Sequence, residues 1–373
     1  MILKNVCFYN EIYEKEIADL RIENCKIAEI GIINEDGRDM SGFTALPGFV
    51  DIHIHGANGG DFSDATIESL DKISSYLAKN GVTSFCGTSM TLDDTALTAI
   101  VKCGREYQGK EIGAKLVGIN LEGPYISYKK KGAQNGDFVR EGSLEEFDQF
   151  FADSGETVKL ITVAPEAFDS DEFIRNVSGK CAVSVGHTNA SADETQRAID
   201  VGARHATHLY NAMTPISHRE AGAAGTLLDN ENVTCELICD GGHICPAILR
   251  NTFKILSEDR ACVISDSMRA AGLGAGEYEL GGQQVFVEEN GKYAVLEDGT
   301  LAASITNVFE EFKNLLAFGI DFKKALKACT INPARAIGLD NEIGSIATGK
   351  AADMIFVDEE MNIKEVYING TLA

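Results

Sequence analysis

Residue types that could do chemistry gather in a few short motifs, each at the end of an apolar run. The motif DIHIH places His53 and His55 two residues apart, so in a strand both imidazoles face the same side. The other members of this set follow later runs or, for His208, lie within one; they are Glu122, His187, His208 and Asp266. Neutral imidazoles combined with carboxylates suit zinc or a similar divalent ion that keeps one position open for water. The pattern therefore predicts a hydrolytic metal site.

Each member of the set also has an ordinary structural explanation. A lone histidine at a strand end is usually a satisfied polar residue, and the Glu-Gly-Pro sequence after residue 121 is typical of a turn. These explanations fail for the whole set, because four of the seven histidines stand where a barrel would aim them at one point. His205 is expected to be structural, and His218 fits either role.

The charge balance restricts the partners. Lys and Arg total 33 against 57 Asp and Glu, a net charge of −24, so neither nucleic acid nor an anionic membrane is expected to bind. An anionic substrate would need a local positive group. Arg219 and His243, the latter in the motif DGGH, could form one, although a solvated loop charge explains Arg219 equally well. The lysines at 129–131 are expected to form a solvated turn near the site.

The chain contains no apolar segment long enough to cross a bilayer, and its N-terminus lacks the core of a signal peptide. Its ten cysteines include no C-x-x-C pair, so the sequence favours small buried thiols in a reducing compartment over disulfides or structural zinc. We therefore expect a cytoplasmic protein.

Elements that would position the motifs repeat along the middle of the chain. Eight short apolar runs, rich in Val, Ile and Thr, are expected to be strands: 48–55, 82–87, 115–121, 158–164, 181–186, 204–209, 233–239 and 261–265. Amphipathic segments between them are expected to be helices, among them 65–80, 191–202, 246–259, 304–319 and 322–338. Asp64 is the expected cap of the first, and Ser191 with Glu194 forms a capping-box spacing in the second.

Eight such units over about 300 residues are typical of an α/β fold of the (β/α)₈ barrel type. A doubly wound open sheet has the same local pattern, and the convergence of the polar residues favours the barrel. Gly272, Gly274 and Gly276 are expected to lie in a flexible loop over its mouth. Residues 1–46 and 344–373 contain only short β-like runs, so we predict one small β-sandwich domain from both termini and a barrel at 47–343.

The motifs PGFVDIHIHG, LEGPYIS, VGHTNA, THLYNAM, DGGH, ISDSM and INPARAIG occur together in this chain. In order and spacing they resemble the N-acetylglucosamine-6-phosphate deacetylases of the amidohydrolase superfamily. The resemblance covers nearly the whole chain, and the combination of LEGP with THLYNAM is its most specific part. It implies hydrolysis of N-acetylglucosamine 6-phosphate to glucosamine 6-phosphate and acetate, in amino-sugar catabolism or recycling.

The resemblance also implies roles for the metal-binding set. Glu122, His187 and His208 would hold the principal ion, while His53 and His55 would hold a second ion with Glu122 as the bridge. One or two divalent ions per subunit are expected, with zinc first and iron, manganese or cobalt as alternatives. Asp266 is the expected catalytic residue: it would take a proton from the attacking water and deliver it to the departing amine.

On the substrate side, the resemblance assigns the sugar phosphate to Asn211, the backbone at Ala212, Arg219 and His243. One or both of the cationic residues would reach across a subunit interface, which predicts a homodimer. Gln134 departs from the family pattern, because several relatives have a histidine there that polarises the substrate carbonyl. A glutamine amide can donate a hydrogen bond but carries no charge. Either Gln134 does this job more weakly, or the metal polarises the carbonyl.

Three rival functions stay open at this point. The nearest is deacetylation of N-acetylgalactosamine 6-phosphate, since no motif reports the orientation of one hydroxyl. Another is a different amidohydrolase activity, such as cyclic-amide or dipeptide hydrolysis, against which the THLYNAM segment argues. The third is a non-catalytic scaffold, which predicts an eroded metal set, whereas the set here is intact.

Overall fold

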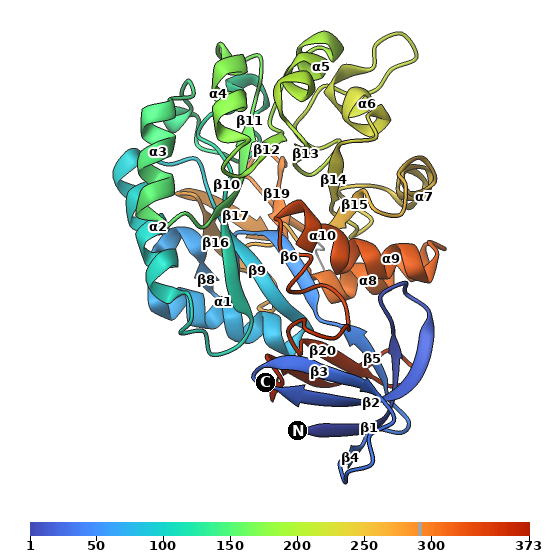
Figure 1. Ribbon diagram of the computed structural model, residues 1–373. Helices are drawn as coiled ribbons and strands as arrows, with labels where there is room; N and C mark the ends of the chain where they lie inside the picture. The colour runs from blue at the N-terminus through green and yellow to red at the C-terminus, as the bar shows by residue number, and fades with distance from the viewer. Residues whose placement is uncertain (290–292) are drawn as a thin grey trace.

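The computed structural model describes residues 1–289 and 293–373, and a barrel of parallel strands forms its centre (Figure 1). The strands lie side by side in the order β6, β9, β10, β11, β12, β13, β14 and β15. Their bounds are β6 Phe49–Ile54, β9 Val82–Ser89, β10 Lys115–Leu121, β11 Val158–Val163, β12 Ala182–Val185, β13 His205–Ala206, β14 Thr234–Leu237 and β15 Ala261–Val263. β6 and β9 are buried along their whole length, as expected for parallel strands covered on both faces.

Backbone hydrogen bonds beyond the last strand close the barrel. The amide of Asp266 donates to the carbonyl of His53 at 2.9 Å, and the amide of His55 donates to the carbonyl of Ser267 at 2.9 Å. The residues after β15 therefore join the end of β6. The predicted (β/α)₈ barrel is confirmed, and the open-sheet alternative is wrong.

Helices cover the barrel on its outside (Figure 1). Their bounds are α1 Ile67–Lys79, α2 Asp94–Tyr107, α3 Leu144–Asp153, α4 Ser170–Val177, α5 Ala192–Val201, α6 Gly222–Asp229, α7 Pro246–Ile255, α8 Val308–Ala317, α9 Phe322–Cys329 and α10 Ile331–Ala336. Short 3-10 helices occupy Phe62–Asp64, Tyr128–Lys130 and Gly136–Phe138. Within the described ranges, no helix has both the length and the apolar character that crossing a bilayer requires.

Three helix predictions can be compared with the observed caps. Ser191 and Glu194 form the expected capping box of α5. The cap of α1 is Thr66, and the expected Asp64 instead accepts hydrogen bonds from Asp61 and Ser69, at the end of the preceding 3-10 helix. The segment 322–338 forms two helices because proline in the first turn of α10 lacks the amide hydrogen that would continue α9.

The two ends of the chain meet in a separate β-sheet, where N- and C-termini lie on the same side of the molecule (Figure 1). Its strands are β1 Ile2–Tyr9, β2 Lys15–Glu23, β3 Lys26–Gly31, β4 Arg38–Asp39, β5 Thr44–Pro47, β20 Met354–Val357, β21 Ile363–Ile368 and β22 Thr371–Leu372. β5 pairs with β20 in antiparallel register, which joins the two ends. The separate sheet from both termini agrees with the predicted fold class. The boundaries 1–46, 47–343 and 344–373 stay a prediction.

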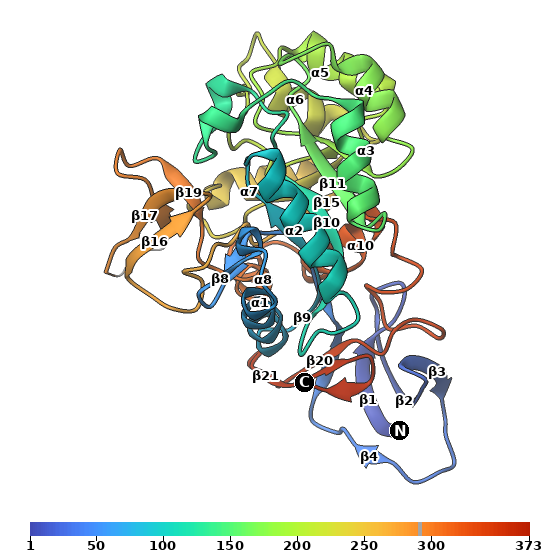
Figure 2. The ribbon, with the colours of Figure 1, turned by 90° about the vertical axis from the view of Figure 1, so that its left-hand side faces the viewer.

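An antiparallel sheet projects from one side of the barrel (Figure 2) and begins at Gly276, directly after the turn that holds Gly272 and Gly274; the sequence predicted no strands there. Its strands are β16 Gly276–Leu280, β17 Gln283–Val287, β18 Tyr293–Val295 and β19 Leu301–Ser304, and the pair β7 Gly56–Ala57 and β8 Gly60–Asp61 lies nearby. Gly281 and Gly282 both have positive φ, the conformation of a tight hairpin turn. Leu280 and Val285 belong to one buried apolar cluster with Met90, so this inserted sheet is anchored on the barrel.

Candidate metal centre and active site

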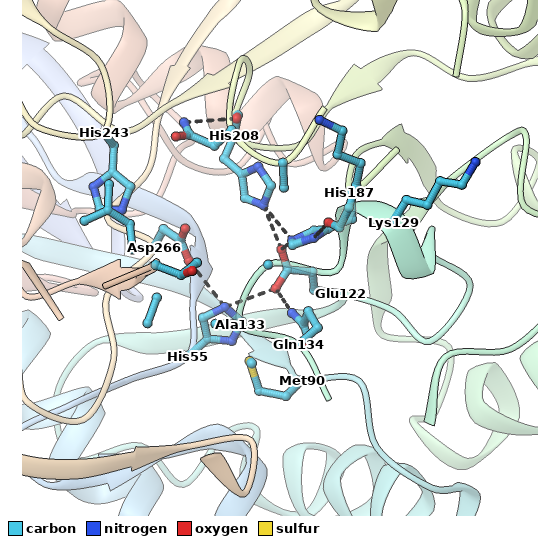
Figure 3. Close-up of a pocket in the computed structure, with 17 residues that line it drawn as sticks. His55, Met90, Glu122, Lys129, Ala133, Gln134, His187, His208, His243 and Asp266 are labelled. Carbon is cyan, nitrogen blue, oxygen red and sulfur yellow. Dashed lines mark hydrogen bonds and ion pairs between the residues drawn. The ribbon is translucent and has the colours of Figure 1, made fainter. Parts of the chain in front are cut away.

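A pocket of about 350 Å³ opens at the carboxyl ends of the barrel strands (Figure 3). Nine of the predicted site residues line it: His55, Glu122, Gln134, His187, His208, Asn211, Ala212, His243 and Asp266. His53 is fully buried and makes its contacts from below the pocket surface. Arg219 lies in an exposed loop and is not part of the pocket wall. The fold therefore gathers ten of the eleven residues.

Glu122, His187 and His208 form one compact donor group. Oε1 of Glu122 lies 3.0 Å from Nε2 of His187 and 2.9 Å from Nε2 of His208. The two Nε2 atoms are themselves 3.1 Å apart. We refer to these three residues as the first donor group.

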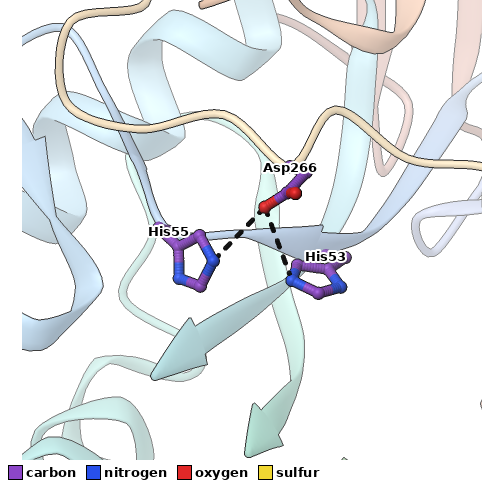
Figure 4. Close-up of side chains that lie close together, drawn as sticks. All are labelled: His53, His55 and Asp266. Carbon is purple, nitrogen blue, oxygen red and sulfur yellow. Dashed lines mark ion pairs between the residues drawn. The ribbon is translucent and has the colours of Figure 1, made fainter. Parts of the chain in front are cut away.

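His53, His55 and Asp266 form a second donor group beside it (Figure 4). Oδ1 of Asp266 lies 3.3 Å from Nε2 of His55 and 3.6 Å from Nε2 of His53. Glu122 also contacts this group, because its Oε2 lies 3.2 Å from His55 and its Oε1 lies 3.6 Å from His53. One carboxylate thus stands between both groups.

The hydrogen bonds of the imidazoles show that both groups suit a cation. Three Nδ1 atoms face acceptors: His53 faces Glu236 Oε2 at 2.9 Å, His55 faces Thr88 O at 3.2 Å and His187 faces Lys130 O at 2.8 Å. Each of these Nδ1 atoms therefore carries a hydrogen, so Nε2 is the nitrogen that faces the carboxylates and would present its lone pair to a bound ion. Nε2 of His53 has no hydrogen-bond partner among the described residues. A divalent ion would fit this arrangement, since it accepts lone pairs from all of these atoms.

The electrostatics of the cluster point the same way. Burial alone would raise the pKa of Glu122, but the charges of His53 and His187 hold it well below its usual range. Burial would lower the pKa of His55, yet hydrogen bonds with Asp266 and Glu122 raise it to about 9. The buried carboxylates of this cluster are therefore stabilised by positive charge nearby. Protons on the imidazoles provide that charge when no metal ion is bound.

Gln134 has a fixed orientation at the edge of the first donor group. Its Oε1 accepts from the amide of Thr91 at 2.7 Å, so its Nε2 must face Glu122, where it donates to Oε2 at 2.6 Å. The side chain is almost fully buried. Gln134 therefore holds the carboxylate that both donor groups share, a contact that sequence reasoning did not anticipate.

Several site residues have a strained backbone. His187, His208 and Asp266 adopt φ values of 44°, 30° and 46°, in the left-handed region that residues other than glycine rarely occupy. Ala212, with φ of 50°, follows the same pattern. Each such residue costs on the order of 1–3 kcal/mol. These backbones turn sharply at the strand ends, which aims the side chains at one point.

The remaining wall of the pocket carries candidate substrate contacts. Nδ1 of His243 lies 2.7 Å from Asp240 Oδ2, which leaves Nε2 of this imidazole as its free nitrogen. Lys129 and Lys130 also line the pocket. Lys129 is exposed, and both lie in the 3-10 helix Tyr128–Lys130, in agreement with the predicted solvated turn near the site. Thr300 to Ala302, around the start of β19, also line the pocket.

Comparison with known proteins gives consistent relatives. Residues 44–373 match the model of the Amidohydrolase family. The chain is 37% identical over 334 residues to N-acetylglucosamine-6-phosphate deacetylase of Bacillus subtilis (strain 168), covering 88% of this chain and 84% of that one. It is 32% identical to N-acetylgalactosamine-6-phosphate deacetylase of Escherichia coli O157:H7, covering 95% of this chain and 94% of the other.

Among solved structures, the fold is similar to a mutant N-acetyl-D-glucosamine-6-phosphate deacetylase from Mycobacterium smegmatis in complex with N-acetyl-D-glucosamine-6-phosphate. The TM-score is 0.93 at 30% identity, covering 100% of this chain and 98% of that chain. The enzyme of the same name from Thermotoga maritima gives a TM-score of 0.89 at 30% identity, covering 100% of this chain and 99% of the other.

Proposed function

Because the chain belongs to the amidohydrolase family, we propose that its pocket hydrolyses the acetamide of N-acetylglucosamine 6-phosphate, releasing acetate and glucosamine 6-phosphate. The protein is an amide hydrolase of amino-sugar metabolism. The observation that carries the assignment is the position of Glu122, which contacts both donor groups inside one pocket. The substrate is inferred from the names of the relatives. The two donor groups could hold a metal ion that activates water, which is the chemistry that hydrolysis of an acetamide needs.

The metal ligands of this centre are proposed to be the first donor group together with His53 and His55 of the second. Glu122, His187 and His208 would hold the principal ion, and His53 and His55 would hold a second ion bridged by Glu122. Zinc is the proposed metal, because an N/O donor set with an open position suits it. When bound, such an ion acidifies a water ligand toward a pKa of about 7 and polarises a carbonyl oxygen.

Asp266 is proposed to carry the proton. Burial would raise the pKa of this carboxyl, but the charge of His53 and the hydrogen bond with His55 lower it, so the group is ionised and able to accept. It takes a proton from the water whose oxygen bonds to the acetamide carbon. It then delivers that proton to the amide nitrogen as the carbon–nitrogen bond breaks, which the poor leaving ability of an amide requires.

Gln134 is proposed to hold Glu122 with one N–H and to offer the other to the substrate carbonyl. This would combine the contact described above with a weaker form of the role that histidine has in several relatives. An amide N–H stabilises a developing oxyanion without carrying a charge itself. The polarisation of the carbonyl would then depend mainly on the metal.

The sugar phosphate is proposed to bind at the opposite side of the pocket. Asn211, the backbone at Ala212 and His243 are the proposed contacts, and Lys129 and Lys130, which also line the pocket, add positive charge to a chain whose net charge is −24. Arg219 is exposed in the single chain. We therefore propose a homodimer in which Arg219 reaches the pocket of the partner subunit. The ten free cysteines favour a reducing compartment, so we propose that the protein acts in the cytoplasm.

The deciding experiment measures acetate release by the purified, metal-loaded protein. Three substrates are compared: N-acetylglucosamine 6-phosphate, its galacto epimer and unphosphorylated N-acetylglucosamine. We expect strong turnover of the first and weak turnover of the other two. Preference for the epimer, which the Escherichia coli relative acts on by its name, would change the substrate and keep the mechanism. No acetate from any of them, with metal bound, would refute the assignment.

A further inference from the structure

A buried glutamate within the barrel lies directly behind the metal ligands. Glu236 belongs to β14 and is 0% exposed. Its side chain contacts residues of β13 and β6, which are not neighbours in the sheet, so it lies in the barrel interior. A carboxylate in such a place is costly unless it is paired and hydrogen-bonded. The hydrogen bonds of Glu236 therefore show what stabilises its buried charge.

Both oxygens of Glu236 accept hydrogen bonds. Oε2 lies 2.9 Å from Nδ1 of His53 and 3.1 Å from the backbone amide of His208. Oε1 lies 3.1 Å from Nε2 of His205, whose Nδ1 is 2.6 Å from the hydroxyl of Thr234. His205, which the sequence predicted to be structural, thus braces Glu236 from the side away from the pocket.

The contact with Glu236 decides which nitrogen of His53 is available to a ligand. A carboxylate accepts but does not donate, so Nδ1 of His53 carries the hydrogen and Nε2 presents its lone pair. That Nε2 has no hydrogen-bond partner among the described residues, and it faces Asp266 and Glu122, each at 3.6 Å (Figure 4 shows the Asp266 contact). If the tautomer reversed, Nε2 would carry a hydrogen and could not bind a metal ion.

Glu236 also joins the two donor groups. The same oxygen that orients His53 of the second group accepts from the backbone of His208 in the first. His208 has a left-handed backbone with φ of 30°, which needs such support from outside its own strand. The spacing between the groups therefore depends on one buried carboxylate.

We propose that Glu236, braced by His205, is a positioning residue that prepares His53 for the second metal ion and sets how tightly that ion binds. The inference rests on the proposed metal centre. It does not depend on which amide is hydrolysed, so a metal titration tests it separately from acetate release.

The test uses the full-length protein after removal of metal, titrated with Zn²⁺ in competition with a chromophoric chelator. Glu236→Gln keeps the oxygen that Nδ1 of His53 and the amide of His208 share, but removes its negative charge and so weakens the charge-assisted hydrogen bond that fixes the tautomer of His53. Glu311→Gln is the matched control, because Glu311 is also 0% exposed and accepts a backbone amide, that of Cys239, at 2.8 Å. His205→Gln serves as a second variant that removes only the brace.

We expect the unaltered chain to bind two ions and Glu236→Gln to bind the second about 10- to 100-fold more weakly, with the first little changed. His205→Gln should show a smaller loss in the same direction, and the Glu311→Gln control none. Visible absorption of the Co²⁺-loaded proteins should change for Glu236→Gln alone at the second equivalent.

Three results would overturn the proposal: a second ion bound as tightly by Glu236→Gln as by the unaltered chain, an equal loss in the Glu311→Gln control, or a single ion in the unaltered chain. If Glu236→Gln does not fold, His205→Gln decides, because unchanged second-ion affinity in that variant would also refute the bracing. Normal titrations without acetate release would instead contradict only the proposed function.

Discussion

Replacement of Asp266 by asparagine tests the proton-transfer step most directly. Asparagine is the right substitution because Asp266 has φ of 46°, a conformation that asparagine adopts more readily than alanine does. The backbone should stay in place, since the amide of residue 266 donates to His53 and its carbonyl accepts from Ser304, each at 2.9 Å. The variant therefore removes the basic oxygen while it keeps the shape of the site.

The expected loss of kcat follows from the two proton transfers that this carboxylate is proposed to make in each turnover. A positioned acid or base contributes about 10²- to 10⁴-fold to the rate, which corresponds to about 2.7–5.4 kcal/mol of barrier. The first donor group does not include Asp266, so at least one ion should still bind. We expect kcat to fall by that factor, while KM changes little.

The assay measures initial rates of acetate release alongside metal content per chain. Asp353→Asn provides a matched control, because Asp353 is 5% exposed and pairs with Lys115 away from the pocket. Its kcat should be that of the unaltered enzyme. A kcat within tenfold of normal for Asp266→Asn, with metal retained, would refute the proton-transfer role. Loss of the second ion together with activity would show that Asp266 acts as a ligand instead.

Three further predictions concern the metal, the phosphate and the terminal sheet. Gln134→Met removes a 2.6 Å hydrogen bond to the Glu122 carboxylate; at about 1.5–3 kcal/mol this should weaken metal binding roughly 10- to 150-fold in a chelator competition, and unchanged affinity would contradict it. Arg219→Ala should raise KM for the phosphorylated sugar about tenfold or more and leave KM for the plain sugar unchanged, as steady-state kinetics on both would show. Hydrogen bonding from Lys4 lowers the pKa of Asp19 from 3.8 to about 2, so its stabilising effect is full above about pH 4 and is lost as pH falls toward 2; Asp19→Asn should be less stable at pH 7, and a denaturation difference that stays constant down to pH 2 would contradict this.

The barrel was predictable because its signals are local and periodic. Each apolar run is short, each ends in polar residues, and the strand ends of a (β/α)₈ barrel share one face. His187 and His208 could therefore be placed together from the sequence, although 21 positions separate them along the chain. The inserted sheet had a signal as well: Gly281 and Gly282 lie between two alternating segments, the pattern of a tight hairpin.

The supports of the site were harder to find than its ligands. Glu236 is the one charged residue of its strand, and a buried charge inside a barrel needs a partner. That reasoning points to a functional neighbour without saying which one, because β14 and β6 are far apart in the sequence. Arg219 is harder still, since the proposed contact belongs to a second copy of the chain.

The backbone conformation of the site residues is the feature that the sequence does not predict. Nothing in the residue types of His187, His208 or Asp266 favours a left-handed conformation strongly enough to impose it, and each position costs on the order of 1–3 kcal/mol. The cost is met by contacts from distant elements, such as Lys130 for the ring of His187 and Glu236 for the amide of His208. A sequence shows the ligands in order along the chain. The directions of their side chains depend on strained backbone conformations, which contacts across the closed barrel stabilise. Closure of the barrel also brings both donor groups into contact with Glu122.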